Sequence, residues 1–435
     1  MAEHIMKEAE LASMLKGQLQ SERTEDTSLT DDESLHLSEE DIKWWRDAKL
    51  GLFVHWGIYA IVGKGEWSYF NEKIPEEEYR RIADTQFHPE LTPEEIAKEW
   101  IHAAKESGMK YAIMVTRHHD GFSLWDSKHS WKDFTSSKLG SKQDYVKAFT
   151  KECRANDLGV GLYYSPMDWR FPGYFDPRGL PENAQLMKEQ AYNQLEELTT
   201  NYGKIDILWY DGGWLAHKGN DADAAWFWEP VKLNTKLRSH QPKLMVTPRS
   251  GYKGDFQCDE GPKEVSGPLV SEPWEKCMSI SSTWGFIEED QYFSSEYIIC
   301  MLVNVICRGG NLILNVGPDP NGRIPKQSQE VLKDLGKWMK ENGEAVYSTR
   351  GGIWEPVDGI YGSTCKDNVV YLHVLDCAAF DGVILPSIEQ SIEGVYLMDD
   401  KPVAFVQEKE GIRIQIPEDV REEKRLDTIL KIILG

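Results

Sequence analysis

The sequence predicts an α/β fold, a (β/α)8-like (TIM-type) barrel followed by a C-terminal antiparallel β-sandwich. Short apolar runs alternate with longer helical patterns over most of the chain, which is typical of parallel strands joined by crossover helices. Seven or eight such units lie within about 300 residues, which fits a closed barrel better than an open sheet. After Gly351 the apolar runs are short and separated by Gly, Asp and Pro, which favours antiparallel strands.

Three parts are predicted along the chain: an N-terminal helix with an acidic linker (1–37), the barrel (38–347) and the β-sandwich (348–435). A weakly amphipathic stretch near the N-terminus precedes a polar, acidic one. Ser38 is followed three residues later by Asp41, which resembles a capping box. We therefore expect a helix to begin there and to carry its tryptophans toward the core.

The strands and helices of the barrel are predicted from hydrophobic periodicity. Apolar runs lie at 50–56, 111–116, 160–165, 205–210, 244–246, 279–284 and 311–316. Helical patterns lie at 93–107, 142–156, 182–201, 222–238, 295–307 and 326–342. The stretch 251–278 has no clear pattern. Neither a GxGxxG after the first strand nor a GxxxxGK[ST] occurs, which argues against a nucleotide-binding fold.

The C-terminal part is predicted to be a small sandwich that braces the barrel. Its candidate strands lie at 369–374, 383–385, 395–397, 402–406, 412–416 and 429–434. This region has no chemical constellation of its own, so we expect no catalytic role for it.

Charge and composition exclude several classes of partner. The formal net charge is −23, which argues against nucleic acid as a partner. No stretch approaches the roughly 18 apolar residues that span a bilayer, so no membrane partner is expected. The seven cysteines lack CxxC spacing, so reduced thiols are expected. The N-terminus does not read as a secretory signal; a cytoplasmic protein is expected, and a homo-oligomer stays open.

The stretch 205–214 holds the first candidate catalytic residue. A buried strand is predicted to end at Asp211, which paired glycines follow and Trp209 and Trp214 flank. Aromatic walls and one carboxylate suit a sugar ring. The alternative is that Asp211 caps the turn after the strand.

Polar and aromatic side chains follow five successive predicted strands, where a barrel carries its active site. They are His55, Glu66 and Trp67; His118 and His119; Tyr163 and Tyr164; Trp209 and Asp211; and Arg249. Each taken singly has an ordinary packing role as an alternative. The adjacent histidines suggest a metal, but neighbouring residues on a strand point to opposite faces. Neither a metal nor a cofactor is expected.

Cleavage of a glycosidic bond with retention needs a second carboxylate about 5 to 5.5 Å from the first. The irregular stretch 251–278 supplies five candidates: Asp259, Glu260, Glu264, Glu272 and Glu275. The residues alone do not choose among them.

Eight segments also carry a resemblance to a known family. They are GLFVHWG at 51–57, GEW at 65–67, TRHHDGF at 116–122, YYS at 163–165, LWYDG at 208–212, PWE at 273–275, STWG at 282–285 and GGNLILNVGP at 309–318. In this order, over residues 40 to 345, they resemble glycoside hydrolase family 29, the retaining α-L-fucosidases. The resemblance implies a barrel with a C-terminal β-sandwich and a substrate that is a fucosylated oligosaccharide or glycoconjugate.

The resemblance also implies roles for single residues. Asp211 matches the nucleophile that attacks the anomeric carbon, and Trp67 matches an aromatic wall of the pocket. The residues that match those gripping the fucose hydroxyls or flanking the nucleophile are His55, Glu66, His118, His119, Tyr164, Trp209 and Arg249. Of the tyrosine pair, Tyr164 is preferred to Tyr163.

Two glutamates compete for the acid/base role. The segment GDFQCDE at 254–260 resembles one whose final Glu serves in some members, although Cys258-Asp259 replaces a more usual Thr-Pro. Other members use the Glu in the segment that PWE resembles. Glu260 is preferred to Glu275 because its spacing from Asp255 is kept.

Three alternatives stay open from the sequence. The first is a catalytically silent carbohydrate-binding barrel, and the second is a metal-dependent hydrolase that uses His55, His118 and His119. The third is a glycosidase of a related sugar such as an α-L-galactoside, because a hydrophobic wall discriminates poorly against one added hydroxyl. The linkage preference is not encoded in any of these motifs.

Overall fold

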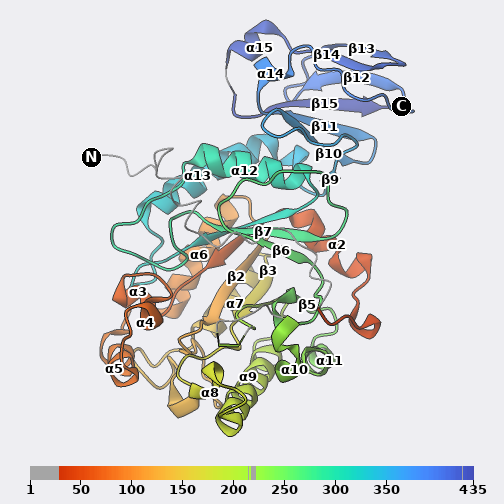
Figure 1. Cartoon of the computed structure of the whole chain (residues 1–435). Helices are drawn as coiled ribbons and strands as arrows, with labels where there is room; N and C mark the ends of the chain where they lie inside the picture. The colour runs from red at the N-terminus through yellow and green to blue at the C-terminus, as the bar shows by residue number, and fades with distance from the viewer. Residues whose placement is uncertain (1–28, 214, 217–221, 424) are drawn as a thin grey trace.

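The computed structural model describes residues 29–213, 215–216, 222–423 and 425–435 (Figure 1). The helix expected near the N-terminus lies outside these residues. The helix expected at Ser38 is confirmed as α2 (Glu39–Ala48), and the Ser38 side chain accepts a hydrogen bond from the backbone N–H of Asp41. The precise limits of the three parts stay a prediction.

Eight parallel strands form one curled sheet, which confirms the barrel. They are β1 (Leu50–Val54), β2 (Tyr111–Arg117), β3 (Gly159–Tyr164), β4 (Ile207–Tyr210), β5 (Met245–Val246), β6 (Gln257–Glu260), β7 (Trp274–Ser279) and β8 (Asn311–Val316). Their order is β5-β4-β3-β2-β1-β8-β7-β6. Consecutive strands therefore lie side by side, and the C-terminal ends of all eight share one rim.

Asp255 joins the two edges of this sheet, where β5 and β6 share no ladder. Its backbone N–H donates to the carbonyl of Val246 over 2.9 Å, and its carboxylate accepts from the Val246 N–H over 2.7 Å. Arg238 donates to the same carboxylate over 2.6 Å. The barrel is thus closed at this seam by one side chain and its backbone.

The inside of the barrel is filled by alternate residues of the strands, because successive side chains of a strand point to opposite faces. Phe53, Tyr111, Tyr163 and Trp209 are among them. Helix α2 contributes Trp45, whose carbonyl accepts from the Asn311 side chain at the start of β8. Helix α2 therefore covers the N-terminal end of the barrel and leaves the opposite rim for the site.

Longer helices surround the sheet, and short ones lie in the connecting loops. The former are α5 (Glu76–Gln86), α6 (Pro93–Glu106), α7 (Tyr145–Ala155), α9 (Pro181–Asn201), α11 (Pro230–His240), α12 (Ser295–Cys307) and α13 (Lys326–Asn342). The latter are α3 (Tyr59–Val62), α4 (Ser68–Asn71), α8 (Pro172–Phe175) and α10 (Ala225–Trp228). The single helix predicted at 222–238 is divided, because Glu229 has a φ of 47° and Pro230 begins α11.

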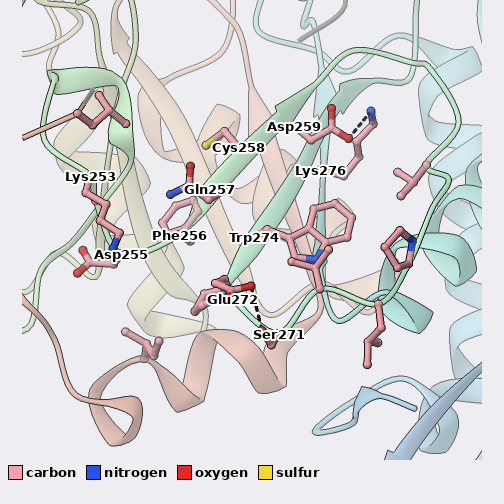
Figure 2. A pocket seen from close by; sticks show the side chains of 18 of the residues that line it. Lys253, Asp255, Phe256, Gln257, Cys258, Asp259, Ser271, Glu272, Trp274 and Lys276 are labelled. Atoms are coloured by element: carbon pink, nitrogen blue, oxygen red, sulfur yellow. Dashed lines mark hydrogen bonds and ion pairs between the residues drawn. The ribbon is translucent and has the colours of Figure 1, made fainter. Parts of the chain in front are cut away.

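The strand predicted at 279–284 is wrong beyond its first residue, and two strands lie in the stretch without a clear pattern. β6 reads QCDE and β7 reads WEKCMS. Both carry charged side chains on short strands, which removes the apolar run that marks a buried strand. The connection between them contains no helix. The outer face of these strands borders a cavity of about 1140 Å³, where Asp259 and Lys276 form an ion pair (Figure 2).

The C-terminal part is antiparallel, as predicted. A five-stranded sheet has the order β12-β15-β11-β10-β9, and a hairpin of β13 (Ala404–Glu408) and β14 (Gly411–Gln415) faces it. The sheet consists of β9 (Arg350–Gly351), β10 (Tyr361–Lys366), β11 (Val369–Val374), β12 (Ile392–Leu397) and β15 (Thr428–Leu434). The run at 383–385 forms only a bridge from Leu385 to Ile412, and β10 was not predicted. The short helices α14 (Cys377–Phe380) and α15 (Glu418–Glu422) complete this part, which rests on α12 (Figure 1).

All seven cysteines lie in the described part of the chain, and each is a free thiol. Within the same residues, no helix combines the length and the apolar character that a membrane span requires.

Candidate active site

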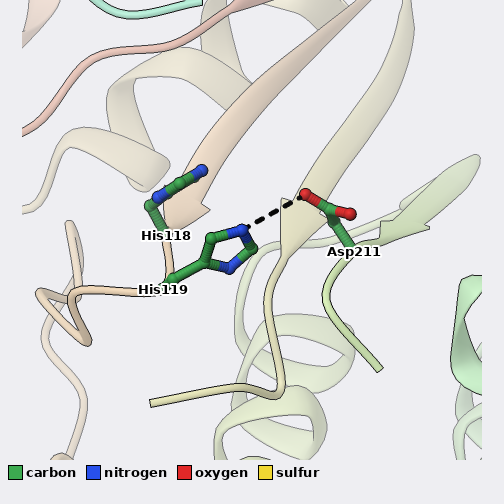
Figure 3. A group of neighbouring side chains, drawn as sticks. All are labelled: His118, His119 and Asp211. Atoms are coloured by element: carbon green, nitrogen blue, oxygen red, sulfur yellow. Dashed lines mark ion pairs between the residues drawn. The ribbon is translucent and has the colours of Figure 1, made fainter. Parts of the chain in front are cut away.

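Asp211 lies directly after β4, and donors from three other segments converge on its carboxylate. Oδ1 accepts from Arg249 Nη1 over 2.7 Å, and Oδ2 accepts from the Tyr163 hydroxyl over 2.8 Å. His119 Nε2 lies 3.6 Å from Oδ2 (Figure 3). The N–H of Gly212 also donates to Oδ1 over 2.8 Å, which is the local turn expected as the alternative. The other contacts come from β3 and from the segments that follow β2 and β5, so Asp211 does more than cap a turn.

Arg249 connects Asp211 to a second carboxylate. Its Nη1 donates to Asp211, and its Nη2 donates to Glu260 Oε2. Glu260 is the last residue of β6, and 30% of its side chain is exposed. The residue before it, Asp259, points to the outer face of the sheet and pairs with Lys276 over 3.2 Å. The two carboxylates therefore share one guanidinium at the rim of the barrel.

Glu275 lies deep inside the barrel and away from this rim. It is the second residue of β7 and is paired in register with Asn311, the first residue of β8. Its carboxyl group is fully buried and accepts from the Tyr111 hydroxyl over 2.5 Å and from Trp209 Nε1 over 3.1 Å. Burial raises the pKa of Glu275 to about 7. The structure does not bring Glu275 to Asp211.

Trp209 forms the layer between Glu275 and the rim. Its ring stacks on Tyr163 with centroids 5.8 Å apart, and the Arg249 guanidinium carbon lies 5.3 Å from its ring centroid. Since its indole N–H is used by Glu275, Trp209 supports Arg249 by its face and offers no donor to a ligand.

The preference for Tyr164 over Tyr163 is wrong. Tyr163 points into the barrel and donates to Asp211. Tyr164 points outward and donates over 2.9 Å to Gln194 on α9. The physical reason is the alternation of side chains along β3, which turns neighbouring residues to opposite faces.

Asn315, which the sequence did not single out, fixes the orientation of His55. Its amide nitrogen donates to the carbonyl of Trp284 over 2.8 Å, so its oxygen is left to accept from His55 Nδ1 over 2.7 Å. Burial lowers the pKa of His55 to about 4, which keeps the ring neutral at pH 7. Nε2 therefore carries a lone pair and can accept a hydrogen bond from a hydroxyl group.

His118 and His119 follow the end of β2, where the backbone is irregular, and their ring centroids lie 4.0 Å apart. His119 contacts Ser165 Oγ over 2.7 Å through Nδ1, while the His118 ring stacks on Tyr163. Burial holds the pKa of His118 well below its usual range. Both rings thus turn to the same side of the strand end.

The ligand atoms of His118, His119 and Asp211 lie within 4.8 Å of one another, so the residue types fit a metal site (Figure 3). However, the Asp211 carboxylate is already held by the Arg249 guanidinium and the Tyr163 hydroxyl. A cation bound to this carboxylate would be repelled by the positive charge of Arg249. The arrangement therefore favours a catalytic carboxylate at Asp211 over a metal ligand.

Glu66 and Trp67, in the loop after β1, complete one side of the site. Glu66 accepts from the N–H of Gly285 over 2.8 Å, and burial raises its pKa, with the nearby charge of Glu260 adding to the effect. The Trp67 ring meets His119 at 5.5 Å and Trp169 at 5.0 Å between centroids.

The sequence analysis missed the roles of Tyr163 and Asn315. The alternation of side chains along β3 could have identified Tyr163 as the inward-facing tyrosine. Asn315 lies in the segment 309–318, but no local pattern indicated that it contacts His55.

Comparisons with known proteins agree with one another. A family model described as Alpha-L-fucosidase matches residues 17–344. A plasma alpha-L-fucosidase of Rattus norvegicus is 31% identical over 336 residues, which cover 70% of this chain and 70% of that protein. The solved structure of alpha-L-fucosidase isoenzyme 1 from Paenibacillus thiaminolyticus is 29% identical, with a TM-score of 0.78 over 91% of this chain and 99% of that one. An alpha-L-fucosidase from Bacteroides thetaiotaomicron is 25% identical, with a TM-score of 0.82 over 94% and 98%.

Glu275 should make the stability of the protein depend on pH. The unfolded chain releases this proton near pH 4.5, whereas the folded protein holds it to about pH 7. The free energy of unfolding should therefore fall by roughly 3 kcal/mol as the pH rises through this window. Glu275→Gln stays neutral, so urea unfolding between pH 4.5 and pH 8 should lack this loss. Glu264→Gln, at an exposed position, is the control and should follow the wild type. Equal pH dependence in Glu275→Gln and wild type would contradict the assignment.

Proposed function

The chain belongs to the alpha-L-fucosidase family, and from this membership and the site we propose that it hydrolyses terminal α-L-fucosyl linkages with retention of configuration. The observation that carries the proposal is the Arg249 guanidinium, which contacts both Asp211 and Glu260. Retention needs two carboxylates that act on one bond. Occupation of both positions favours a hydrolase over a silent binding barrel.

Asp211 is the proposed nucleophile. Hydrogen bonds from Tyr163, Arg249 and the Gly212 N–H fix the orientation of its carboxylate. In the first step a carboxylate oxygen attacks the anomeric carbon, the bond to the leaving oxygen breaks, and a glycosyl ester forms on Asp211. In the second step water attacks the same carbon and releases fucose and the free carboxylate.

Glu260 is the proposed acid/base, and Arg249 couples it to the nucleophile. In the first step Glu260 gives its proton to the leaving oxygen and becomes an anion while Asp211 becomes a neutral ester. In the second step Glu260 takes a proton from water and the Asp211 anion is restored. Arg249 contacts both groups. In this mechanism its ionised partner is Asp211 before the first step and Glu260 while the ester exists.

The remaining side chains are proposed to bind the fucose hydroxyls. The neutral His55 offers an acceptor at Nε2, and Glu66 offers a carboxyl group next to Gly285 in the loop after β7. Trp67 supplies an aromatic wall. The substrate class that follows is a fucosylated oligosaccharide or glycoconjugate. Assays with fucosylated oligosaccharides of defined linkage would identify the preferred linkage.

Asp211→Asn should remove the nucleophile and keep the fold. We expect the kcat for an aryl α-L-fucoside to fall by roughly 10³- to 10⁶-fold, with circular dichroism and the Tm close to those of the wild type. Added azide should then give the β-L-fucosyl azide, because the azide displaces the leaving group directly. Near-normal turnover without azide would refute the role of Asp211.

Glu260→Ala should slow both steps, but azide should restore turnover of an activated aryl fucoside. Here the product should be the α-L-fucosyl azide, since azide attacks the glycosyl ester on Asp211. Glu275→Gln is the matched variant, and its turnover should gain nothing from azide, because Glu275 is buried away from the rim. If azide rescued the Glu275 variant and not Glu260→Ala, Glu275 would be the acid/base and Glu260 would not.

The two tyrosines of β3 provide a paired test. Tyr163→Phe deletes a hydrogen bond to an ionised carboxylate, so kcat/KM should fall by roughly 10- to 100-fold. Tyr164→Phe deletes only the contact with Gln194 outside the barrel, so kcat/KM should stay within about twofold while the free energy of unfolding drops by roughly 1 kcal/mol. The reverse pattern would mean that Tyr164 is the residue at the site.

A further inference from the structure

We propose that Ser165 is a positioning residue that acts through His119. Its hydroxyl donates to His119 Nδ1 and so places the proton of the neutral ring on Nε2, the nitrogen that faces Asp211 (Figure 3). This inference rests on the proposed function, and it gives a role to a residue that the proposed mechanism leaves unassigned.

The His119 ring lies between two oxygen atoms. Nδ1 lies 2.7 Å from Ser165 Oγ, and Nε2 lies 3.6 Å from Asp211 Oδ2. A neutral imidazole carries one proton, so one of its nitrogens donates and the other accepts. The contact that Nδ1 makes therefore decides whether Nε2 presents an N–H or a lone pair to the proposed nucleophile.

The contacts of the Ser165 hydroxyl favour a proton on Nε2. A hydroxyl has one proton to donate, and this one contacts two acceptors: His119 Nδ1 over 2.7 Å and the Met167 carbonyl over 3.4 Å. The first distance is that of a well-formed hydrogen bond, whereas 3.4 Å is long for an O–H donor. If Nδ1 carried the proton instead, the buried hydroxyl would be left with the poorer acceptor, which costs free energy.

The side of the ring that faces Asp211 favours the same tautomer. A carboxylate 3.6 Å from Nε2 attracts an N–H and repels a lone pair. The same oxygen, Oδ2, accepts from the Tyr163 hydroxyl over 2.8 Å, so the His119 N–H adds a second donor to it. Ser165 thus fixes the proton of the ring from the end that points away from the nucleophile.

Packing opposes a flip of the ring, which would exchange the two nitrogens. His119 is buried, and a Cβ atom added to Gly212 would lie 2.8 Å from His119 Cε1 and 3.1 Å from Nδ1. The Gly212 backbone therefore lies directly against the ring. The rings of Trp67 and Trp169 lie 5.5 and 5.3 Å from it between centroids. Such close packing keeps Nδ1 directed at Ser165.

The backbone on both sides of this contact is fixed as well. The Ser165 N–H donates to the carbonyl of Arg117 over 3.1 Å, and the Arg117 guanidinium donates to the carbonyl of Ser165. The same guanidinium pairs with Asp168 over 2.6 Å. Farther along, the Trp169 N–H donates to the carbonyl of His119 over 3.0 Å. The segment after β3 is thus tied to the end of β2, which holds the hydroxyl and the imidazole in one arrangement.

Loss of the Ser165 hydroxyl should slow the chemical step more than it weakens substrate binding, because His119 Nε2 acts on the nucleophile. In Ser165→Ala, the kcat for an aryl α-L-fucoside should fall roughly five- to tenfold, the size of one hydrogen bond, while KM stays within about twofold. Ser127→Ala is the control. Its buried hydroxyl accepts from Gln194 over 3.0 Å, and both kinetic constants should stay at the wild-type values.

Ser165→Cys separates hydrogen bonding from packing. The thiol fills the space of the hydroxyl but is only a weak donor. We therefore expect the Tm to lie close to that of the wild type while kcat stays nearly as low as in Ser165→Ala. Recovery of kcat in Ser165→Cys would assign Ser165 a packing role and overturn the proposal.

The tautomer can be observed without turnover. In protein labelled with [15N]histidine, two-bond ¹H–¹⁵N correlation spectra distinguish the two neutral tautomers from each other and from the imidazolium. The His119 signals, assigned by their loss in His119→Gln, should show the proton on Nε2 in the wild type and in Ser127→Ala. In Ser165→Ala the fraction with the proton on Nε2 should fall.

The spectra and the kinetics fail in different ways. A wild-type His119 with its proton on Nδ1, or with both nitrogens protonated, would refute this inference and leave the proposed function standing. An unchanged spectrum or an unchanged kcat in Ser165→Ala would also refute it. A wild type that shows the expected tautomer but does not cleave the aryl fucoside would refute the proposed function, and the catalytic role of Ser165 with it.

Discussion

The contact of Arg249 with both Asp211 and Glu260 is the constraint on which the rest of the site depends. Two carboxylates that lie close together at the rim of the barrel repel each other when both are charged. A guanidinium that donates to both removes this repulsion through fixed geometry. Trp209 supports the guanidinium from below, and the Trp209 indole is in turn fixed by Glu275. The buried glutamate therefore contributes to the site through the position of Trp209, without contact with Asp211 or Glu260.

The period of two residues along each strand decides which side chains take part. Tyr163 and Tyr164 are neighbours, yet one donates to Asp211 and the other to α9. Glu260 and Asp259 are neighbours as well, and they face the rim and the outer surface respectively. Position along the strand adds a second condition. Glu275 points inward, but it lies near the start of β7, whereas a group must point inward and stand at the C-terminal end of its strand to reach a sugar.

Most of the fold and the position of Asp211 at the end of β4 could be predicted from the sequence, because β1, β2, β3, β4 and β8 are apolar runs with clear limits. β6 and β7 could not be predicted, since their charged side chains hide the strand period. The same two strands carry Glu260 and Glu275, so the sequence could not separate the two glutamates by position. The role of Asn315 was also out of reach, because it arises from β8, β1 and the loop after β7 coming together. Local patterns identify strands, but they do not show which residues meet across a barrel.

Burial of the polar side chains fits the proposed site to a neutral ligand. His55 and His118 lose their charge when they are removed from water, and Asn315 determines which nitrogen of His55 keeps its proton. A neutral imidazole with a defined lone pair accepts from a hydroxyl group, whereas an imidazolium would compete with Arg249 for the carboxylates. The positive charge of Arg249 is thus directed to Asp211 and Glu260, and hydroxyl recognition is left to neutral groups. In the proposed mechanism, this division keeps the charge changes of catalysis separate from the hydrogen bonds to the sugar.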